Sequence, residues 1–96
     1  MRNDDYIDLG KAITQFLEKH GMRDAADIQK IIDNWEKIMG KPIAQQTERL
    51  WLRDRVFYVA VKSPVWKNEL TMIRTAIKEM IHDKIGRVFL DEVRIV

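Results

Sequence analysis

The sequence predicts a single α+β domain in which two helices precede a β-hairpin, and a third helix leads to a last strand. Three observations support this prediction. Apolar residues recur at helical spacing in three segments, and they alternate with polar residues in residues 49–61 and again near the end of the chain. Glycine or proline stands at most of the expected boundaries. Because 96 residues suffice for one modest core, we expect one domain over residues 1–96, with residues 1–4 frayed.

The first two helices are predicted from their apolar stripes. Residues 4–20 form an amphipathic helix that ends at Gly21, with the stripe Tyr6, Leu9, Ile13, Phe16 and Leu17. A second helix has Asp24 as its N-cap and ends at Gly40. Its stripe is Ile28, Ile31, Ile32, Trp35, Ile38 and Met39. Pro42 opens a short further turn.

The alternating segment is predicted to be a hairpin with Asp54-Arg55 as a two-residue turn, although Arg55 stands where such a turn prefers glycine. The pairs in this register are Arg53 with Val56, Leu52 with Phe57, Trp51 with Tyr58 and Leu50 with Val59. One face of the hairpin then carries the core residues Leu50, Leu52, Phe57, Val59 and Val61.

The third helix begins at Ser63-Pro64, with the serine as N-cap and the proline at the first helical position, and it ends at Gly86. Its inner face is Trp66, Leu70, Ile73, Ile77 and Ile81. A last strand over Glu92–Val96 follows, and a right-handed crossover would place it parallel to one hairpin strand. We therefore expect a two-layer domain, with a three-stranded mixed sheet and the helices on one face.

The positive charge is concentrated in one segment. Residues 49–78 hold seven Lys/Arg and two Asp/Glu, a net charge of +5, whereas residues 1–48 carry −2 and residues 79–96 carry −1. A cluster of this kind suits an acidic partner. A solvated helix face beside charged strand edges would produce the same pattern, so the charge alone leaves both explanations open.

The sheet face opposite the helices is the predicted binding surface. Trp51 and Tyr58 are cross-strand neighbours there, and Arg94 is a further candidate beside them. Aromatic rings beside cations suit single-stranded nucleic acid, because bases stack on rings while Arg and Lys neutralise phosphates. The predicted nucleic-acid-binding residues are Arg49, Trp51, Arg53, Arg55, Tyr58, Lys62, Lys67 and Arg74. The Trp–Tyr pair could instead only stabilise the hairpin, or be covered by the first helix or by another protein chain.

The sequence gives no support to catalysis. His20 and His82 stand alone on different predicted helices, and there is no Gly-rich phosphate loop or nucleophile motif. The chain has no cysteine, which excludes disulfides and zinc–thiolate sites. We expect no enzyme activity, no cofactor and no bound metal. No apolar run reaches membrane-spanning length, and we expect a soluble cytoplasmic protein with no membrane partner.

Four short patterns together resemble a known family. They are Trp35-x4-Gly40-x2-Ile43-Ala44, Val59-x-Val61, Ser63-x2-Trp66-x2-Glu69-Leu70 and Val93-x-Ile95. Their order and spacing resemble the bacterial DciA-like family, also called the Dna[CI] antecedent, and the likeness covers about residues 5–96. The chain looks most like the short single-domain members. The resemblance implies a KH-like fold, association with the replicative DNA helicase during loading, and affinity for nucleic acid, including single-stranded DNA.

Two functions therefore compete. The first is a non-enzymatic nucleic-acid-binding accessory of DNA replication. The second is a protein-interaction module that docks on a helicase or self-associates without binding nucleic acid directly. The choice between DNA and RNA and the oligomeric state stay open at this point.

Overall fold

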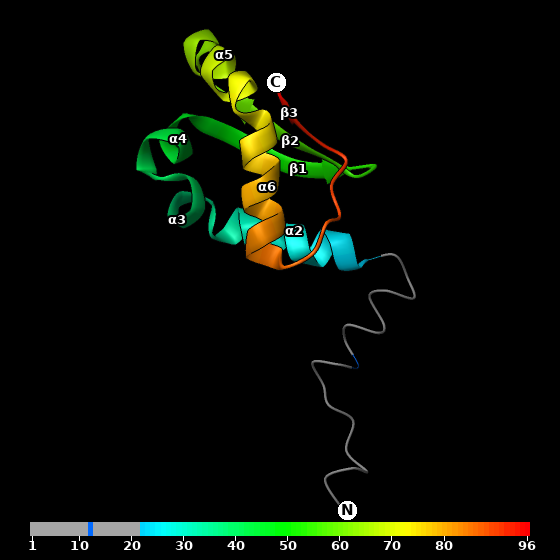
Figure 1. The fold of residues 1–96 in the computed structure, drawn as a ribbon. Helices are drawn as coiled ribbons and strands as arrows, with labels where there is room; N and C mark the ends of the chain where they lie inside the picture. The colour runs from blue at the N-terminus through cyan, green and yellow to red at the C-terminus, as the bar shows by residue number, and fades with distance from the viewer. Residues whose placement is uncertain (1–11, 13–21) are drawn as a thin grey trace, which may run out of the picture.

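The structure of the protein is a computed structural model, in which residue 12 and residues 22–96 are described. A three-stranded sheet in the order β1-β2-β3 lies behind helix α6 in the view of Figure 1. The strands are β1 (Thr47–Arg53), β2 (Val56–Val61) and β3 (Glu92–Ile95). The helices are α2 (Arg23–Asp33), α3 (Trp35–Met39), α4 (Lys41–Gln46), α5 (Pro64–Met72) and α6 (Arg74–Ile85). The predicted α+β class and element order are confirmed, while the first predicted helix, residues 4–20, lies outside the described residues except for residue 12.

The hairpin has the predicted register. Strands β1 and β2 are antiparallel, with Trp51 opposite Tyr58 and Leu52 opposite Phe57. The two turn residues both have positive φ angles, 51° at Asp54 and 65° at Arg55. A primed two-residue turn requires this geometry because its twist matches that of the strands. Arg55 therefore adopts a conformation that glycine would adopt at lower cost.

Strand β3 lies parallel to β2, as the crossover rule predicts, and pairs Tyr58 with Arg94. Backbone hydrogen bonds extend the pairing at both ends. The N–H of Asp91 donates to the carbonyl of Arg55 (2.8 Å), and the N–H of Val96 donates to the carbonyl of Val59 (2.9 Å). The outer positions of the three strands are thereby placed side by side.

The second predicted helix is interrupted, and its predicted N-cap is wrong. The N-cap position is Met22, and Asp24 lies in the first turn of α2. The side-chain Nδ2 of Asn34 donates to the carbonyl of Lys30 (2.8 Å), and its backbone N–H donates to the carbonyl of Ile31 (3.2 Å). An asparagine that competes for helix carbonyls in this way breaks the regular pattern, so α3 is a separate helix.

The third predicted helix is also two helices, which meet at Ile73. The hydroxyl of Thr71 donates to the carbonyl of Lys67 (2.6 Å), and the N–H of Ile73 donates to the carbonyl of Leu70 instead of continuing the helical pattern. Back-bonding threonines bend helices. As a result Ile73, predicted to face inward, is 43% exposed. Ser63 is the N-cap residue as predicted, but its side chain makes no capping hydrogen bond.

The core lies between the sheet and the helices. Trp35 is buried and meets the edge of Phe57, with ring centroids 5.8 Å apart. Its indole N–H donates to the hydroxyl of Thr47 (3.0 Å), so this polar atom is satisfied. The other buried apolar residues are Ile28, Ile31, Val59, Leu70, Ile77, Ile81, Phe89, Leu90, Val93 and Ile95. Leu50, Leu52, Val61 and Trp66 pack against them and are partly buried, so one face of the hairpin is the core face as predicted.

Candidate nucleic-acid interface

A row of four side chains crosses the face of the sheet opposite the core. Trp51 of β1 stacks on Tyr58 of β2, with ring centroids 5.0 Å apart and planes 4° from parallel. The guanidinium carbon of Arg49 lies 4.7 Å from the centre of the Trp51 ring, and that of Arg94 lies 5.6 Å from the centre of the Tyr58 ring. We call Arg49, Trp51, Tyr58 and Arg94 the cation–aromatic row. Each contact is of the kind that holds a cation against an aromatic face.

The strand order explains how the row forms. Trp51 and Arg94 come from the strands on either side of β2, so both flank Tyr58. Arg49 lies two residues before Trp51 on the same strand, and therefore on the same face. The rings are half-buried against one another and under guanidinium groups. A nucleic-acid base that stacks on Tyr58 must therefore first displace Arg94.

The predicted cations differ in their partners. Arg53 lies 3.8 Å from the carboxylate of its neighbour Asp54, and both are exposed. Arg55 bonds Asp91 (3.2 Å), the residue just before β3, away from the row. For Arg49 and Lys62, no carboxylate of the described residues lies within salt-bridge distance. Arg49 and Lys62 are exposed, so their charges are available to a ligand.

Two of the predicted cations are on the helices and not on the sheet. Lys67 is exposed on α5, and Arg74 is the first residue of α6. Arg74 borders a small hollow of about 140 Å³ with Thr75, Lys78 and residues 91–93. Because α5 and α6 cover the core face of the sheet, the structure does not bring these two cations together with the row. Arg94, in contrast, belongs to the row because its guanidinium lies over Tyr58. The same guanidinium also pairs with Glu92 (2.5 Å).

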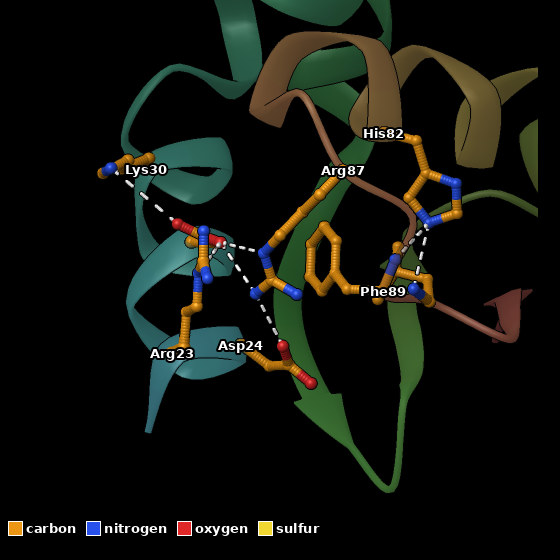
Figure 2. A network of polar contacts seen from close by, with 8 residues as sticks. Arg23, Asp24, Lys30, His82, Arg87 and Phe89 are labelled. Carbon is orange, nitrogen blue, oxygen red and sulfur yellow. Dashed lines mark hydrogen bonds and ion pairs between the residues drawn. The ribbon is translucent and has the colours of Figure 1, made fainter. Parts of the chain in front are cut away.

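A second polar cluster was not predicted from the sequence (Figure 2). Arg87, in the connection between α6 and β3, donates to Asp24 (2.6 Å) and Asp27 (2.8 Å) of α2. Its guanidinium carbon also lies 4.6 Å from the centre of the Phe89 ring. Asp27 is 8% exposed and is further approached by Lys30 at 3.8 Å. The partners are 60 and 63 residues apart in the chain, so no local pattern could have indicated this contact.

An apolar surface lies on the outer side of the third predicted helix. Met72 is 80% exposed and Val65 is 69% exposed on α5. Ile73, between α5 and α6, is 43% exposed, and Met80 of α6 is 41% exposed. Exposed apolar patches on soluble domains frequently mark protein contacts, so this surface is a second candidate site.

Two further kinds of feature are absent from the part of the chain that the structure describes. Within residues 22–96 no group of three or more His, Asp or Glu side chains could hold a metal ion. No helix of the described segment has the length and apolarity needed to cross a membrane.

Comparisons with known proteins place the chain in a family. The family model described as Dna[CI] antecedent, DciA, matches residues 8–95. A UPF0232 protein of Corynebacterium glutamicum (strain R) is 26% identical over 87 residues, which are 91% of this chain and 49% of that relative. The chain thus spans about half the length of the curated relative.

No solved structure matches the chain, so the KH-like fold stays a prediction. The name of the DciA family implies association with the replicative helicase. Because the family model matches nearly the whole sequence, the chain belongs to the DciA family.

Proposed function

We propose that the chain is a non-enzymatic accessory protein of DNA replication that binds single-stranded DNA through the outer face of its sheet. The observation that carries this proposal is the cation–aromatic row, in which Trp51 and Tyr58 stack between Arg49 and Arg94. Aromatic rings and cations on one sheet surface are the two components that single-strand binding requires.

The row suggests how binding proceeds. A base can replace Arg94 on the face of Tyr58, or Arg49 on the face of Trp51, because a guanidinium is held there by only about 0.5–1 kcal/mol at an exposed site. Stacking of a base on an aromatic side chain contributes about 1–3 kcal/mol. The displaced guanidinium of Arg49 is then free to bond the phosphate of the same nucleotide, whereas that of Arg94 must also exchange its ion pair with Glu92 for the phosphate. Bases in a duplex are already stacked on one another, so this exchange favours single strands.

The distribution of charge supports a path along the hairpin. Arg53, Trp51 and Arg49 alternate along β1 on the outer face, and Lys62 follows β2 beyond Ala60, the partner of Arg49. A strand that crosses the aromatic pair would meet Arg53 on one side and Arg49 with Lys62 on the other. Each phosphate neutralised adds to the salt dependence of binding.

The family supports the biological setting. Since the DciA family is associated with the replicative helicase, we propose that helicase as the protein partner. Single-stranded DNA is present wherever a replicative helicase has separated a duplex, so one small domain could contact both.

The test is a titration of labelled single-stranded DNA by fluorescence anisotropy at two salt concentrations. We expect the affinity of the natural chain to fall with salt. The double variant Trp51→Ala/Arg49→Ala should bind at least about tenfold more weakly, since it loses one stacking ring and one phosphate cation. Lys84→Ala, which removes one charge from the last turn of α6, is the control and should bind like the natural chain. Affinity that is independent of salt, or that survives the double variant, would contradict the proposal.

The alternative function, a protein-interaction module without direct nucleic-acid binding, is supported by the apolar surface of α5 and α6, where Met72 is 80% exposed. A molecular mass that rises with concentration in light scattering, or co-purification of a helicase, would favour it if DNA binding were absent. Met72→Glu should then abolish the association. Val88→Glu, at a comparably exposed residue (78%) of the α6–β3 connection, should leave it unchanged.

A further inference from the structure

The connection between α6 and β3 is held to the rest of the domain at two points (Figure 2). At the first, Arg87 donates from Nε to Asp27 and from Nη2 to Asp24, both on α2. Burial disfavours the charge on Arg87, but the hydrogen bonds to the two carboxylates outweigh this and raise its pKa above the ordinary value for arginine. The guanidinium of Arg87 therefore stays charged throughout the pH range in which a histidine titrates.

At the second point the connection is held by a histidine. The backbone N–H groups of Phe89 and Leu90 donate to Nε2 of His82 on α6, at 3.3 and 2.9 Å. A ring nitrogen accepts hydrogen bonds only when it carries no proton, so these contacts require neutral His82 with its proton on Nδ1. The side chains of Phe89 and Leu90 are in the core, at 0% and 3% exposure. The two amides could therefore not turn to water without moving buried apolar groups.

The surroundings of His82 oppose its protonation. Partial burial lowers its pKa below 6.5, and three cations lower it further, while Asp83 has the opposite effect. The cations come from three segments: Lys78 from α6, Arg55 from the hairpin turn and Arg87 from the connection itself. Near the ring, Arg55 and Lys78 are also anchored on Asp91, through its carboxylate and its backbone carbonyl. On α2, Asp24 and Asp27 both form ion pairs with Arg87.

We propose that His82 and Arg87 form an acid-sensitive latch on the α6–β3 connection, which opens at the histidine when His82 takes up a proton. Once Nε2 is protonated it is a donor and no longer an acceptor. The N–H groups of Phe89 and Leu90 then face another N–H, so both hydrogen bonds are lost together. Arg87 keeps its carboxylate partners and continues to hold the start of the connection to α2. The opening is therefore local to Phe89, Leu90 and the strand that follows them.

The sign of the pH dependence follows from the direction of the shift. Above pH 6.5, the ordinary value for histidine, both the folded and the unfolded chain carry neutral His82, and the latch contributes its full stability. As the pH falls below that value, the unfolded chain binds the proton more readily than the folded one, so stability decreases. The decrease ends once the pH has passed the lowered pKa of the folded state.

The latch has a consequence for the cation–aromatic row. Strand β3 begins two residues after Leu90 and carries Arg94 beside Tyr58. Opening the latch thus loosens the strand that supplies one end of the row. An effect on DNA binding rests on the proposed function, but the latch itself does not.

The experiment is amide hydrogen exchange by NMR on the full chain, as a function of pH. The quantity compared is the protection of each amide relative to its intrinsic exchange rate at that pH. As the pH falls from 6.5 towards the lowered pKa of His82 in the folded chain, we expect the protection of the Phe89 and Leu90 amides to fall by up to about tenfold per pH unit, because the open latch takes up one proton that the closed latch does not. The amides of the central strand β2 should keep their protection over the same range.

Two variants separate the latch from general acid unfolding. His82→Gln retains a side-chain acceptor that does not titrate, so the pH step at Phe89 and Leu90 should disappear while their protection remains. His20→Gln removes the other histidine and should leave the step unchanged. A step that persists in His82→Gln would overturn the proposal. A loss of protection that is equal at Phe89, Leu90 and the β2 amides would also overturn it, because it would show global unfolding.

Discussion

The two faces of the sheet are made by alternate residues of the same strands, and they use aromatic rings in opposite ways. On the core face, Phe57 is fully buried and meets Trp35 of α3 edge to face. On the outer face, its neighbour Tyr58 is half-buried and stacks on Trp51, with Arg94 on its other side. The core ring packs against the helices, while the outer rings, among the residues that the structure describes, contact one another and two cations. Stability should therefore depend mainly on the first face, and binding on the second.

The largest expected change is a loss of folding stability when the buried Phe57 ring is truncated. Phe57→Ala removes a fully enclosed side chain and leaves a cavity under α3, so we expect a loss of about 3–5 kcal/mol in the free energy of unfolding. Urea denaturation followed by tryptophan fluorescence measures it. Tyr58→Ala is the matched comparison on the same strand and should lose clearly less. Equal losses would mean that the outer row carries as much stability as the core.

The next effect concerns the stacked pair. Trp51→Ala should weaken binding of single-stranded DNA by about 1–3 kcal/mol. It should also lower the free energy of unfolding, because the stacked pair contributes about 0.5–1.5 kcal/mol in addition to the apolar area that it buries. Anisotropy titration and urea denaturation on the same sample separate the two losses. Trp51→Phe keeps an aromatic face and should recover part of the affinity. A variant that loses stability but no affinity would assign the pair to the hairpin alone.

The smallest expected change is in the salt dependence of DNA binding when one cation of the outer face is removed. Arg49→Gln retains length and polarity but removes a charge that has no described carboxylate partner. The slope of log affinity against log salt should become less steep by about 0.7, the contribution of one phosphate contact on a single strand. Stability should not change measurably, because the side chain is exposed. An unchanged slope would remove Arg49 from the interface.

Much of the sheet was predictable because its pattern is local. Alternation in residues 49–61 and a two-residue turn at Asp54-Arg55 were enough to predict the register that pairs Trp51 with Tyr58. The parallel β3 followed from the handedness of strand–helix–strand connections. The breaks at Asn34 and Ile73 were not predicted, since they depend on side chains that compete for helix carbonyls within otherwise regular apolar stripes.

The candidate sites were predictable only in part. The aromatic pair and Arg49 could be placed on one face from the hairpin pattern, whereas the inclusion of Arg94 needed the position of β3. Lys67 and Arg74 belong to the same basic segment of the sequence, yet the structure places them on the helices. Asp24 was interpreted as a helix cap, but its carboxylate bonds Arg87 from the other end of the chain.

The sequence by itself determined the layers of this protein: which segments are helices, which are strands, and which face of the hairpin is apolar. These features depend on the spacing of residues along the chain, which hydrophobic periodicity records directly. Only the tertiary structure decided which charges meet. The row between Arg49 and Arg94, and the contacts of Arg87 and His82, join residues from different elements. Such contacts depend on how the packed elements orient their side chains, and no spacing along the chain records that orientation.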